Sequence, residues 1–280
     1  MWSNLHTHSH FCDGKGAPQE YVDAAIAHGM EAIGFSSHAP LPFHRPWAME
    51  AERLNDYTSE IDRLRTMFHD IEIYRGLEID YIPGITGPSR YAGKLDYTIG
   101  SVHFVGKKDG SDWEIDNTTE IFKDGLQSIF GGDIKRAVTR YYEIMIEMLT
   151  NDPPDILGHL DKIKVNASAF GLDQTEPWYK ALINRVLDTA QHHRTIIEVN
   201  TRGIYKQKTT EPYPAPWILE QICAKNISIT LSSDAHHPSE VIREFDNTLA
   251  LVRDIGFTYV VALRSGGWQN VPLSQFGPRR

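Results

Sequence analysis

The chain has 280 residues, of which 41% are hydrophobic and 23% are charged, and its net charge is −9. This composition is typical of a globular protein with a large apolar core, and the acidic balance argues against nucleic-acid binding through a broad basic surface. No apolar run approaches the roughly 18 residues that cross a bilayer, and Cys12 and Cys223 are too few for a disulfide framework. We therefore expect a cytoplasmic protein that binds neither membrane nor nucleic acid.

Short apolar runs alternate with amphipathic helical segments along the chain. Strands are expected at 2–5, 32–35, 71–81, 97–104, 156–159, 195–200, 227–231 and 259–263. Helices are expected at 18–29, 49–69, 119–150 with a break at Gly131-Gly132-Asp133, 176–193, 216–225 and 240–256. A polar excursion at 106–118, which contains Trp113, is a candidate lid. The alternation predicts one α/β domain over residues 1–280, with a largely parallel sheet closed into a barrel of seven or eight units.

Histidines and carboxylates occur at or near the carboxyl ends of the expected strands. The set comprises His6, His8, Asp13, His38, Glu78, His103, His159, Asp234 and His236. These strand ends meet on one face of a parallel barrel, so we expect the side chains to converge there. Burying these side chains together without partners would cost free energy, whereas divalent cations would bind them as ligands. Nitrogen and oxygen donors favour zinc, manganese or iron. A cleaved signal peptide is not expected, because its removal would take His6 away.

The order of these motifs resembles the PHP (polymerase and histidinol phosphatase) family, and within it the histidinol-phosphate phosphatases. The matching stretches are His6-Thr7-His8, Asp13-Gly14, Ser37-His38-Ala39-Pro40, Gly76–Tyr81, Gly100–His103, Gly158-His159, Glu198–Thr201 and Ser233–His236. The resemblance to the histidinol subgroup rests on Asp80–Gly84, Gly100–His103 and Gly131–Asp133.

The resemblance implies a distorted (β/α)7 TIM-like barrel with three divalent metal ions at the C-terminal face of its strands. The implied ligands are His6, His8, Glu78 and Asp234 for one metal, Glu78, His103 and His159 for a second, and Asp13, His38 and His236 for a third. The family varies at the Asp13 position and sometimes has histidine there. The implied reaction is hydrolysis of L-histidinol phosphate to L-histidinol and phosphate in histidine biosynthesis, with Glu78, Asp234 and His236 as catalytic residues.

A site with several cations suggests its own chemistry. A water that bridges two cations becomes a hydroxide nucleophile near neutral pH, which predicts direct in-line hydrolysis of a phosphate monoester without a phosphoenzyme. Phosphate also needs cationic side chains, and Arg202 is the first candidate because a guanidinium binds two oxygens at once. Lys162, Lys164 and His44 are further candidates. Asp80 shares a strand face with Glu78 and is expected to orient a ligand.

Three other functions stay open. A PHP phosphoesterase for another small phosphate ester or a nucleotide would use the same site. A barrel amidohydrolase shares the His-x-His start but usually needs a lysine at the end of strand four, where this chain has His103. A non-catalytic metal-binding protein would also explain the ligands. The expected partner is a small-molecule phosphate ester, and a monomer or a small homo-oligomer fits the sequence equally.

Overall fold

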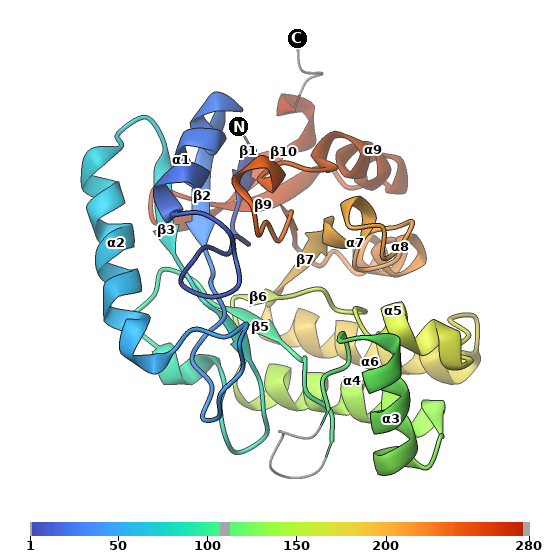
Figure 1. The fold of residues 1–280 in the computed structure, drawn as a ribbon. Helices are drawn as coiled ribbons and strands as arrows, with labels where there is room; N and C mark the ends of the chain where they lie inside the picture. Colours follow the sequence, from blue (N-terminus) through green and yellow to red (C-terminus); the bar gives the residue numbers. More distant parts are fainter. Residues whose placement is uncertain (1, 107–112, 277–280) are drawn as a thin grey trace.

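The computed structural model describes residues 2–106 and 113–276, and its parallel strands form a nearly closed barrel (Figure 1). One sheet has the order β1 (Trp2–Asn4), β2 (Met30–Phe35), β3 (Glu72–Arg75). The other has the order β4 (Glu78–Asp80), β5 (Ile99–Ser101), β6 (Ile156–Leu157), β7 (Ile196–Asn200), β8 (Ile229–Ser232). Parallel bridges from His38 to Glu78 and from Thr7 to Ala235 join the two sheets on both sides. Counting β3 and β4 as one bent run gives the seven strands of the expected (β/α)7 barrel.

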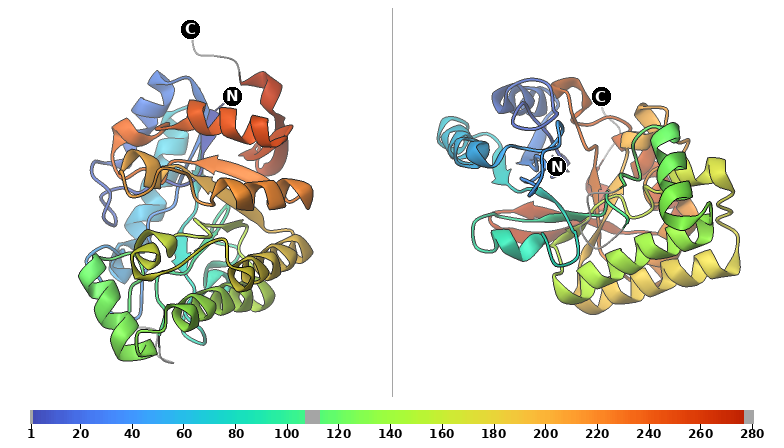
Figure 2. Two further views of the ribbon diagram at one scale, coloured as in Figure 1. Left: turned by 90° about the vertical axis from the view of Figure 1, so that its right-hand side faces the viewer. Right: turned by 60° about the horizontal axis from the view of Figure 1, so that its bottom comes forward.

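Helices cover the outside of this barrel (Figures 1 and 2). The longer ones are α1 (Pro18–Ala27), α2 (Leu54–Met67), α3 (Thr119–Phe130), α4 (Ile134–Asn151), α6 (Pro177–His193), α8 (Pro216–Ala224) and α9 (Phe245–Ile255). The short α5 (Lys164–Ala167) and α7 (Arg202–Tyr205), which the sequence did not predict, follow β6 and β7. Asp133 caps α4 as expected, because its side chain accepts a hydrogen bond from the Arg136 amide.

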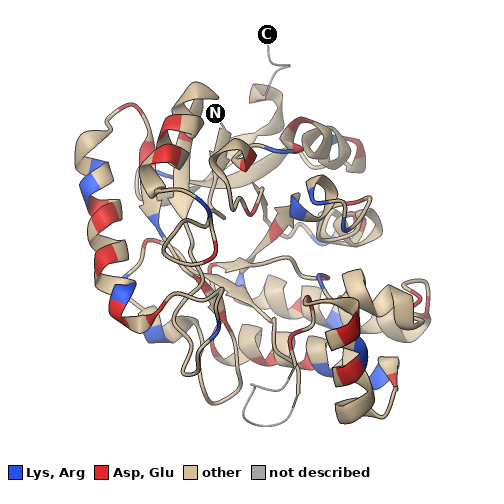
Figure 3. Ribbon diagram, viewed as in Figure 1, with Lys and Arg blue, Asp and Glu red and all other residues tan. Residues whose placement is uncertain are grey.

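Charged residues of both signs lie on the outer helices (Figure 3). On α2 they pair at helical spacing, Arg63 with Glu60 and Arg65 with Asp62. Within the described ranges, no helix is long and apolar enough to pass through a bilayer.

The strand expected at 71–81 is divided at Gly76-Leu77 into β3 and β4. The reason is Tyr97, whose hydroxyl donates to the carbonyl oxygens of Leu5 (2.5 Å) and Phe35 (3.2 Å) inside the barrel. A Cβ atom on Gly76 would lie 2.4 Å from the Tyr97 ring, so only glycine lets the chain pass this ring. Beyond the break the chain gains β5 as a neighbour, where the Ile99 amide donates to the Leu77 carbonyl.

The C-terminal region differs from the expectation in two ways. The strand expected at 259–263 is β9 (Tyr259–Arg264), which pairs with an unexpected β10 (Gly267–Pro272) in a separate antiparallel hairpin. Ser265 and Gly266 form its two-residue turn with φ of 49° and 71°, typical of a hairpin turn with two left-handed residues. The last helix begins at Phe245 and not near 240, because a 3-10 turn (Pro238–Glu240) and the left-handed Glu244 precede it.

The candidate lid at 106–118 is described only in part, since residues 107–112 lie outside the described ranges. Trp113 is a core residue, 2% exposed, and its ring packs against Phe122 and Phe130. The Val105 amide donates to the Trp113 carbonyl, which ties this end of the excursion to the segment just after β5. Trp113 itself is therefore part of the fold and not of a lid.

The packing of Gly76 predicts a stability effect. Gly76→Ala forces its Cβ against the Tyr97 ring, so we expect the free energy of unfolding to fall by about 1–3 kcal/mol. Gly267→Ala is the matched control, because the atom nearest its added Cβ is 4.0 Å away. Urea denaturation of both variants measures the effect, and equal stability of the two would contradict this account of the break between β3 and β4.

Candidate metal centre

All nine residues that the sequence placed at strand ends meet at the C-terminal face of the barrel. Each lies in or just after a parallel strand, or in the loop that follows β1: His6, His8, Asp13, His38, Glu78, His103, His159, Asp234 and His236. Seven of them are buried, whereas Asp13 and His236 keep part of their surface exposed. The barrel thus brings together residues that are more than 200 positions apart in the chain.

The carboxylate of Glu78, which is 1% exposed, lies in the middle of this group. Its Oε2 atom is 3.1–3.4 Å from imidazole nitrogens of three residues, His6, His8 and His38. Its Oε1 atom is 2.8 Å from His159 Nε2 and 3.6 Å from His103 Nε2. One carboxylate therefore contacts five imidazoles from four strand ends, a position suited to bridging two metal ions.

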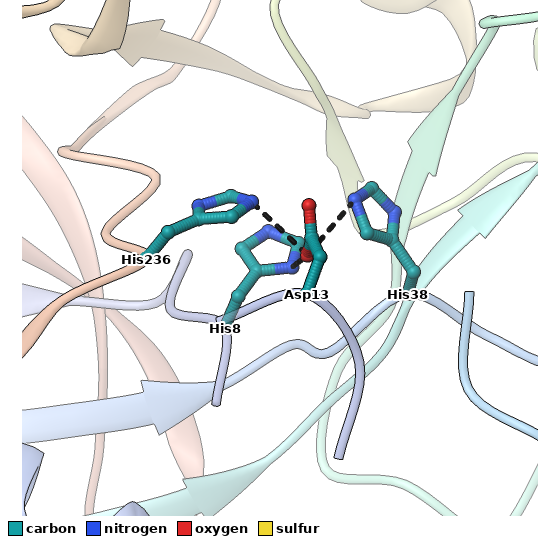
Figure 4. Close-up of side chains that lie close together, drawn as sticks. All are labelled: His8, Asp13, His38 and His236. Carbon is teal, nitrogen blue, oxygen red and sulfur yellow. Dashed lines mark ion pairs between the residues drawn. The ribbon is translucent and has the colours of Figure 1, made fainter. Parts of the chain in front are cut away.

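Each of the three implied metal sites has a matching set of ligand atoms that lie within 4.8 Å of one another, and a fourth such set combines His38, Asp80 and His103. The first contains His6, His8 and Asp234, and the second contains Glu78, His103 and His159. The third contains Asp13, His38 and His236, with His8 as an additional member. Figure 4 shows the imidazoles of this third set around Asp13, whose Oδ1 is 3.2 Å from His236 Nε2 and 3.9 Å from His38 Nε2.

Several atoms in this group are buried without a hydrogen-bond partner. They are His6 Nε2, His8 Nε2, His38 Nδ1 and Asp234 Oδ1. Buried polar atoms are normally hydrogen-bonded, so four such atoms aimed at one volume indicate that a ligand completes them. Nitrogen and carboxylate donors suit zinc, manganese or iron, and the residues therefore fit divalent metal ions.

Cys12 does not change this donor set, although its Sγ is 3.5 Å from His8 Nδ1. Burial raises the pKa of the Cys12 thiol to about 12, so the sulfur stays protonated at neutral pH. Among the described residues, the sets of ligand atoms that lie close enough to share a metal do not include Cys12, and their donors are nitrogen and oxygen.

The imidazoles differ in their affinity for protons. Burial lowers the pKa of His8 and of His38 to about 4, so both are neutral and able to coordinate at pH 7. Burial alone would also lower the pKa of His103, but the Asp80 carboxylate outweighs it and raises this pKa to about 9. Burial would likewise lower the pKa of His6, but nearby carboxylates outweigh it. They raise this pKa well above its usual value, and Glu198 has the largest effect. Without metal, His6 and His103 hold protons at neutral pH.

Two buried carboxylates hold the candidate ligands in place. Asp80, expected in this role, has its Oδ1 2.9 Å from His103 Nδ1. Glu198 belongs to one of the sequence motifs, although the sequence did not predict its role, and its Oε1 lies 2.5 Å from His6 Nδ1. Its other oxygen accepts a hydrogen bond from the His159 amide at 2.7 Å. The available signal was a carboxylate in the middle of the otherwise uncharged, buried strand 196–200, where only a partner at the barrel centre could satisfy it.

A cavity of about 640 Å³ opens above the metal centre. Arg202 and Lys162 line it, as expected for phosphate ligands. The Arg202 guanidinium donates to the Asp234 carbonyl oxygen (2.8 Å), and Lys162 Nζ lies 2.9 Å from Asp116 Oδ2 and 3.2 Å from His103 Nε2. The sequence did not single out other lining residues, which include Trp47, Glu114, Asp116, Lys206, Lys208 and Tyr213.

Lys164 and His44, also expected at the phosphate, lie elsewhere. Lys164 is 3% exposed and its ammonium is 2.8 Å from both Asp161 Oδ2 and Glu211 Oε1, so it is a buried structural ion pair. His44 has a side chain that is 72% exposed, and its Nδ1 is 2.9 Å from Glu50 Oε1. Neither residue lines the cavity, which corrects both expectations.

Comparison with known proteins agrees with this geometry. Residues 4–202 match the PHP domain family. A relative from Deinococcus radiodurans, named as a probable histidinol-phosphatase, is 30% identical over 261 residues, which cover 90% of this chain and 92% of the relative. The histidinol-phosphatase of Bacillus subtilis is 27% identical over 255 residues, covering 84% of this chain and 94% of that protein.

Solved structures share the fold. Histidinol phosphate phosphatase from Lactococcus lactis, complexed with zinc, L-histidinol and phosphate, superposes with a TM-score of 0.71 at 22% identity, covering 95% of this chain and 98% of that one. A structure from Listeria monocytogenes gives a TM-score of 0.78 at 21% identity, covering 88% of this chain and 99% of that one. The motifs, the metal centre and the match over most of its length agree: the chain belongs to the PHP domain family.

Proposed function

We propose that this chain is a metal-dependent phosphate monoester hydrolase that converts L-histidinol phosphate and water to L-histidinol and phosphate. The observation that carries the proposal is the group of nine nitrogen and oxygen donors at the base of a cavity that Arg202 and Lys162 also line. The substrate comes from the relatives named histidinol-phosphatase and from the L. lactis enzyme complexed with L-histidinol and phosphate.

Three divalent ions, zinc, manganese or iron, are proposed for the three sets of ligands at Glu78, Asp234 and Asp13 described above. The zinc in the L. lactis structure and the unpartnered buried atoms support metal binding. When bound, divalent cations offset the negative charge of the phosphoryl oxygens and activate water for attack.

The chain's own residues have proposed roles in this reaction. Glu78, on β4, and Asp234, just after β8, hold the centre together, while the partly exposed His236 faces the cavity beside Asp13. Arg202 and Lys162 are placed to donate hydrogen bonds to phosphate oxygens. This arrangement favours direct in-line hydrolysis, because bound metal ions, Arg202 and Lys162 would offset the phosphoryl charge and the protein would not have to supply a nucleophile.

We also propose that residues 1–280 fold as one barrel domain. The bridge between Thr7 and Ala235 places the end of β1 beside the end of β8. The Trp2 ring packs against Phe245 and Phe276, with ring centroids 5.5 and 4.8 Å away. Both ends of the described chain thus contribute to one core.

Substrate selection tests the proposed function. After reconstitution with Zn²⁺ or Mn²⁺, we expect kcat/KM for L-histidinol phosphate to exceed that for sugar phosphates, nucleotides and a phosphodiester by at least ~100-fold, or about 2.7 kcal/mol. Phosphate release measures each substrate. A flat profile or a preference for the diester would overturn the substrate while leaving the metal centre intact.

Metal binding should depend on pH because His6 and His103 are protonated in the metal-free protein. A metal must displace these protons, so affinity rises as the pH rises from 7 towards the pKa of His103, about 9, and binding at pH 7 releases protons. Titration calorimetry of Zn²⁺ in two buffers of different ionisation enthalpy counts them. Asp80→Asn removes the carboxylate that raises the pKa of His103, so it should release fewer protons. Binding heats that are independent of the buffer would contradict the proposal.

Arg202 and Lys164, both predicted from the sequence to bind phosphate, should respond differently to substitution. Arg202→Ala is expected to raise KM for the monoester about 10- to 100-fold by removing a charged hydrogen-bond donor, without loss of bound metal. Lys164→Met should leave KM unchanged but lower the free energy of unfolding by about 3 kcal/mol, because it strands buried Asp161. Steady-state kinetics, metal analysis and urea denaturation separate the effects. Tyr205 still donates to the Asp234 carbonyl oxygen in the Arg202 variant, so loss of its metal would contradict the assignment of Arg202 to phosphate.

A further inference from the structure

One part of the cavity wall has no role in the proposed metal and phosphate sites. It is formed by Trp47, in the loop after β2, and by Asp116, in the segment after β5. Around Asp116 the side chains alternate: Trp113 and Ile115 are buried in the core, whereas Glu114 and Asp116 line the cavity. The backbone that presents Asp116 is fixed, because the Ile115 amide donates to the His103 carbonyl at 2.9 Å.

The Trp47 indole is held beside the metal centre. It stacks on Phe104, with centroids 5.8 Å apart and an angle of 26° between the rings. Its ring also packs edge-on against the imidazoles of His38 and His103, with ring centroids 4.7 and 6.0 Å apart. Although its neighbours Ala48 and Met49 are buried, Trp47 is only partly buried and lines the cavity. A fixed aromatic surface at this place suits a ring that stacks against it.

The two carboxylate oxygens of Asp116 have different surroundings. Its Oδ2 accepts from Lys162 Nζ at 2.9 Å, while its Oδ1 has no hydrogen-bond partner among the described residues and its side chain is 26% exposed. Lys162 offsets part of the Asp116 charge, and a positive group on the ligand would offset the remaining repulsion between this carboxylate and a phosphate dianion. The free oxygen lies beside the cation proposed to hold phosphate, so it is placed for a cationic group close to the phosphate ester.

We propose that Trp47 and Asp116 form the subsite for the leaving group, which takes an alcohol carrying both an aromatic ring and an ammonium group. The ring stacks on Trp47, and the ammonium group donates to Asp116 Oδ1. The inference rests on the proposed function and names what the substrate carries besides phosphate. L-Histidinol has both features, whereas sugar phosphates have neither.

Four phosphate esters separate the two contacts on the metal-reconstituted enzyme. L-Histidinol phosphate carries ring and ammonium, phenyl phosphate carries only the ring, ethanolamine phosphate carries only the ammonium, and ethyl phosphate carries neither. Trp47→Leu should lower kcat/KM at least about tenfold for the two ring-bearing esters and less than about threefold for the other two. Asp116→Asn should do the same for the two ammonium-bearing esters, because the amide oxygen can still accept from Lys162.

Trp178→Leu is the matched control, since Trp178 lies on α6 and does not line the cavity. It should leave the ratios among the esters unchanged. Equal losses on all four esters would mean that Trp47 and Asp116 only support the fold or the metal centre, which overturns the subsite.

The experiment also separates the two levels of the proposal. A wild-type enzyme that prefers L-histidinol phosphate, with variants that keep its preference, would overturn the subsite and leave the proposed function standing. A wild-type enzyme without that preference, whose variants still show ring- and ammonium-dependent losses, would overturn the histidinol assignment and support the subsite. No hydrolysis of any ester would overturn both.

Discussion

The close approach of charged and chargeable groups around Glu78 is the constraint on which the rest of the structure depends. A carboxylate that is 1% exposed lies within 3.6 Å of nitrogens from five imidazoles, and a second carboxylate, Asp234, lies beside them. In a medium of low polarity such a group is stable only when its charges balance and its lone pairs are used. Divalent cations satisfy both conditions, which is why the fold can keep these residues together.

Rigidity around this centre comes from buried groups that are not proposed as metal ligands. Glu198 ties His6 on the β1 side to the His159 amide after β6, and also accepts from Asn200 and Ser232. Asp80 similarly fixes the ring of His103. Because each of these carboxylates connects two or more strand ends, the barrel and the ligand geometry stabilise each other. The same hydrogen bonds determine which ring nitrogen of His6 and His103 is free to face a metal.

Much of this could be predicted from the sequence, because a parallel barrel places strand ends on one face. Nine ligand positions followed from that rule and from the family motifs, and all nine meet in the structure. Residues outside strand ends were less predictable. Lys162 and Lys164 are only two positions apart in the chain. Lys164 forms a buried ion pair with Asp161, whereas Lys162 lines the cavity. The short helix α5 gives the two side chains these different directions. It has only four residues, too few for a periodic pattern that would predict a helix.

The same limit applies to features fixed by long-range contacts. Gly76 divides an apparently continuous strand only because Tyr97, 21 positions later, occupies the barrel interior. Within one segment, the apolar alternation of 71–81 looks like a single strand, and nothing local indicates the ring that bends it. The hairpin between β9 and β10, by contrast, could have been predicted locally. Its turn, Ser265-Gly266, is a two-residue sequence with glycine of the kind that joins two strands in a hairpin.

Asp234 shows how the metal centre and the phosphate wall depend on each other. It has a φ of 52°, a left-handed conformation that is unfavourable for a residue with a side chain. Its carbonyl oxygen accepts from the Arg202 guanidinium at 2.8 Å and from the Tyr205 hydroxyl at 3.2 Å, and these bonds stabilise that backbone. Both donors belong to α7, directly after β7. A guanidinium has five N–H donors, so Arg202 can hold Asp234 with one and still present others to phosphate. One short helix thus orients a candidate metal ligand and supplies a cation to the cavity.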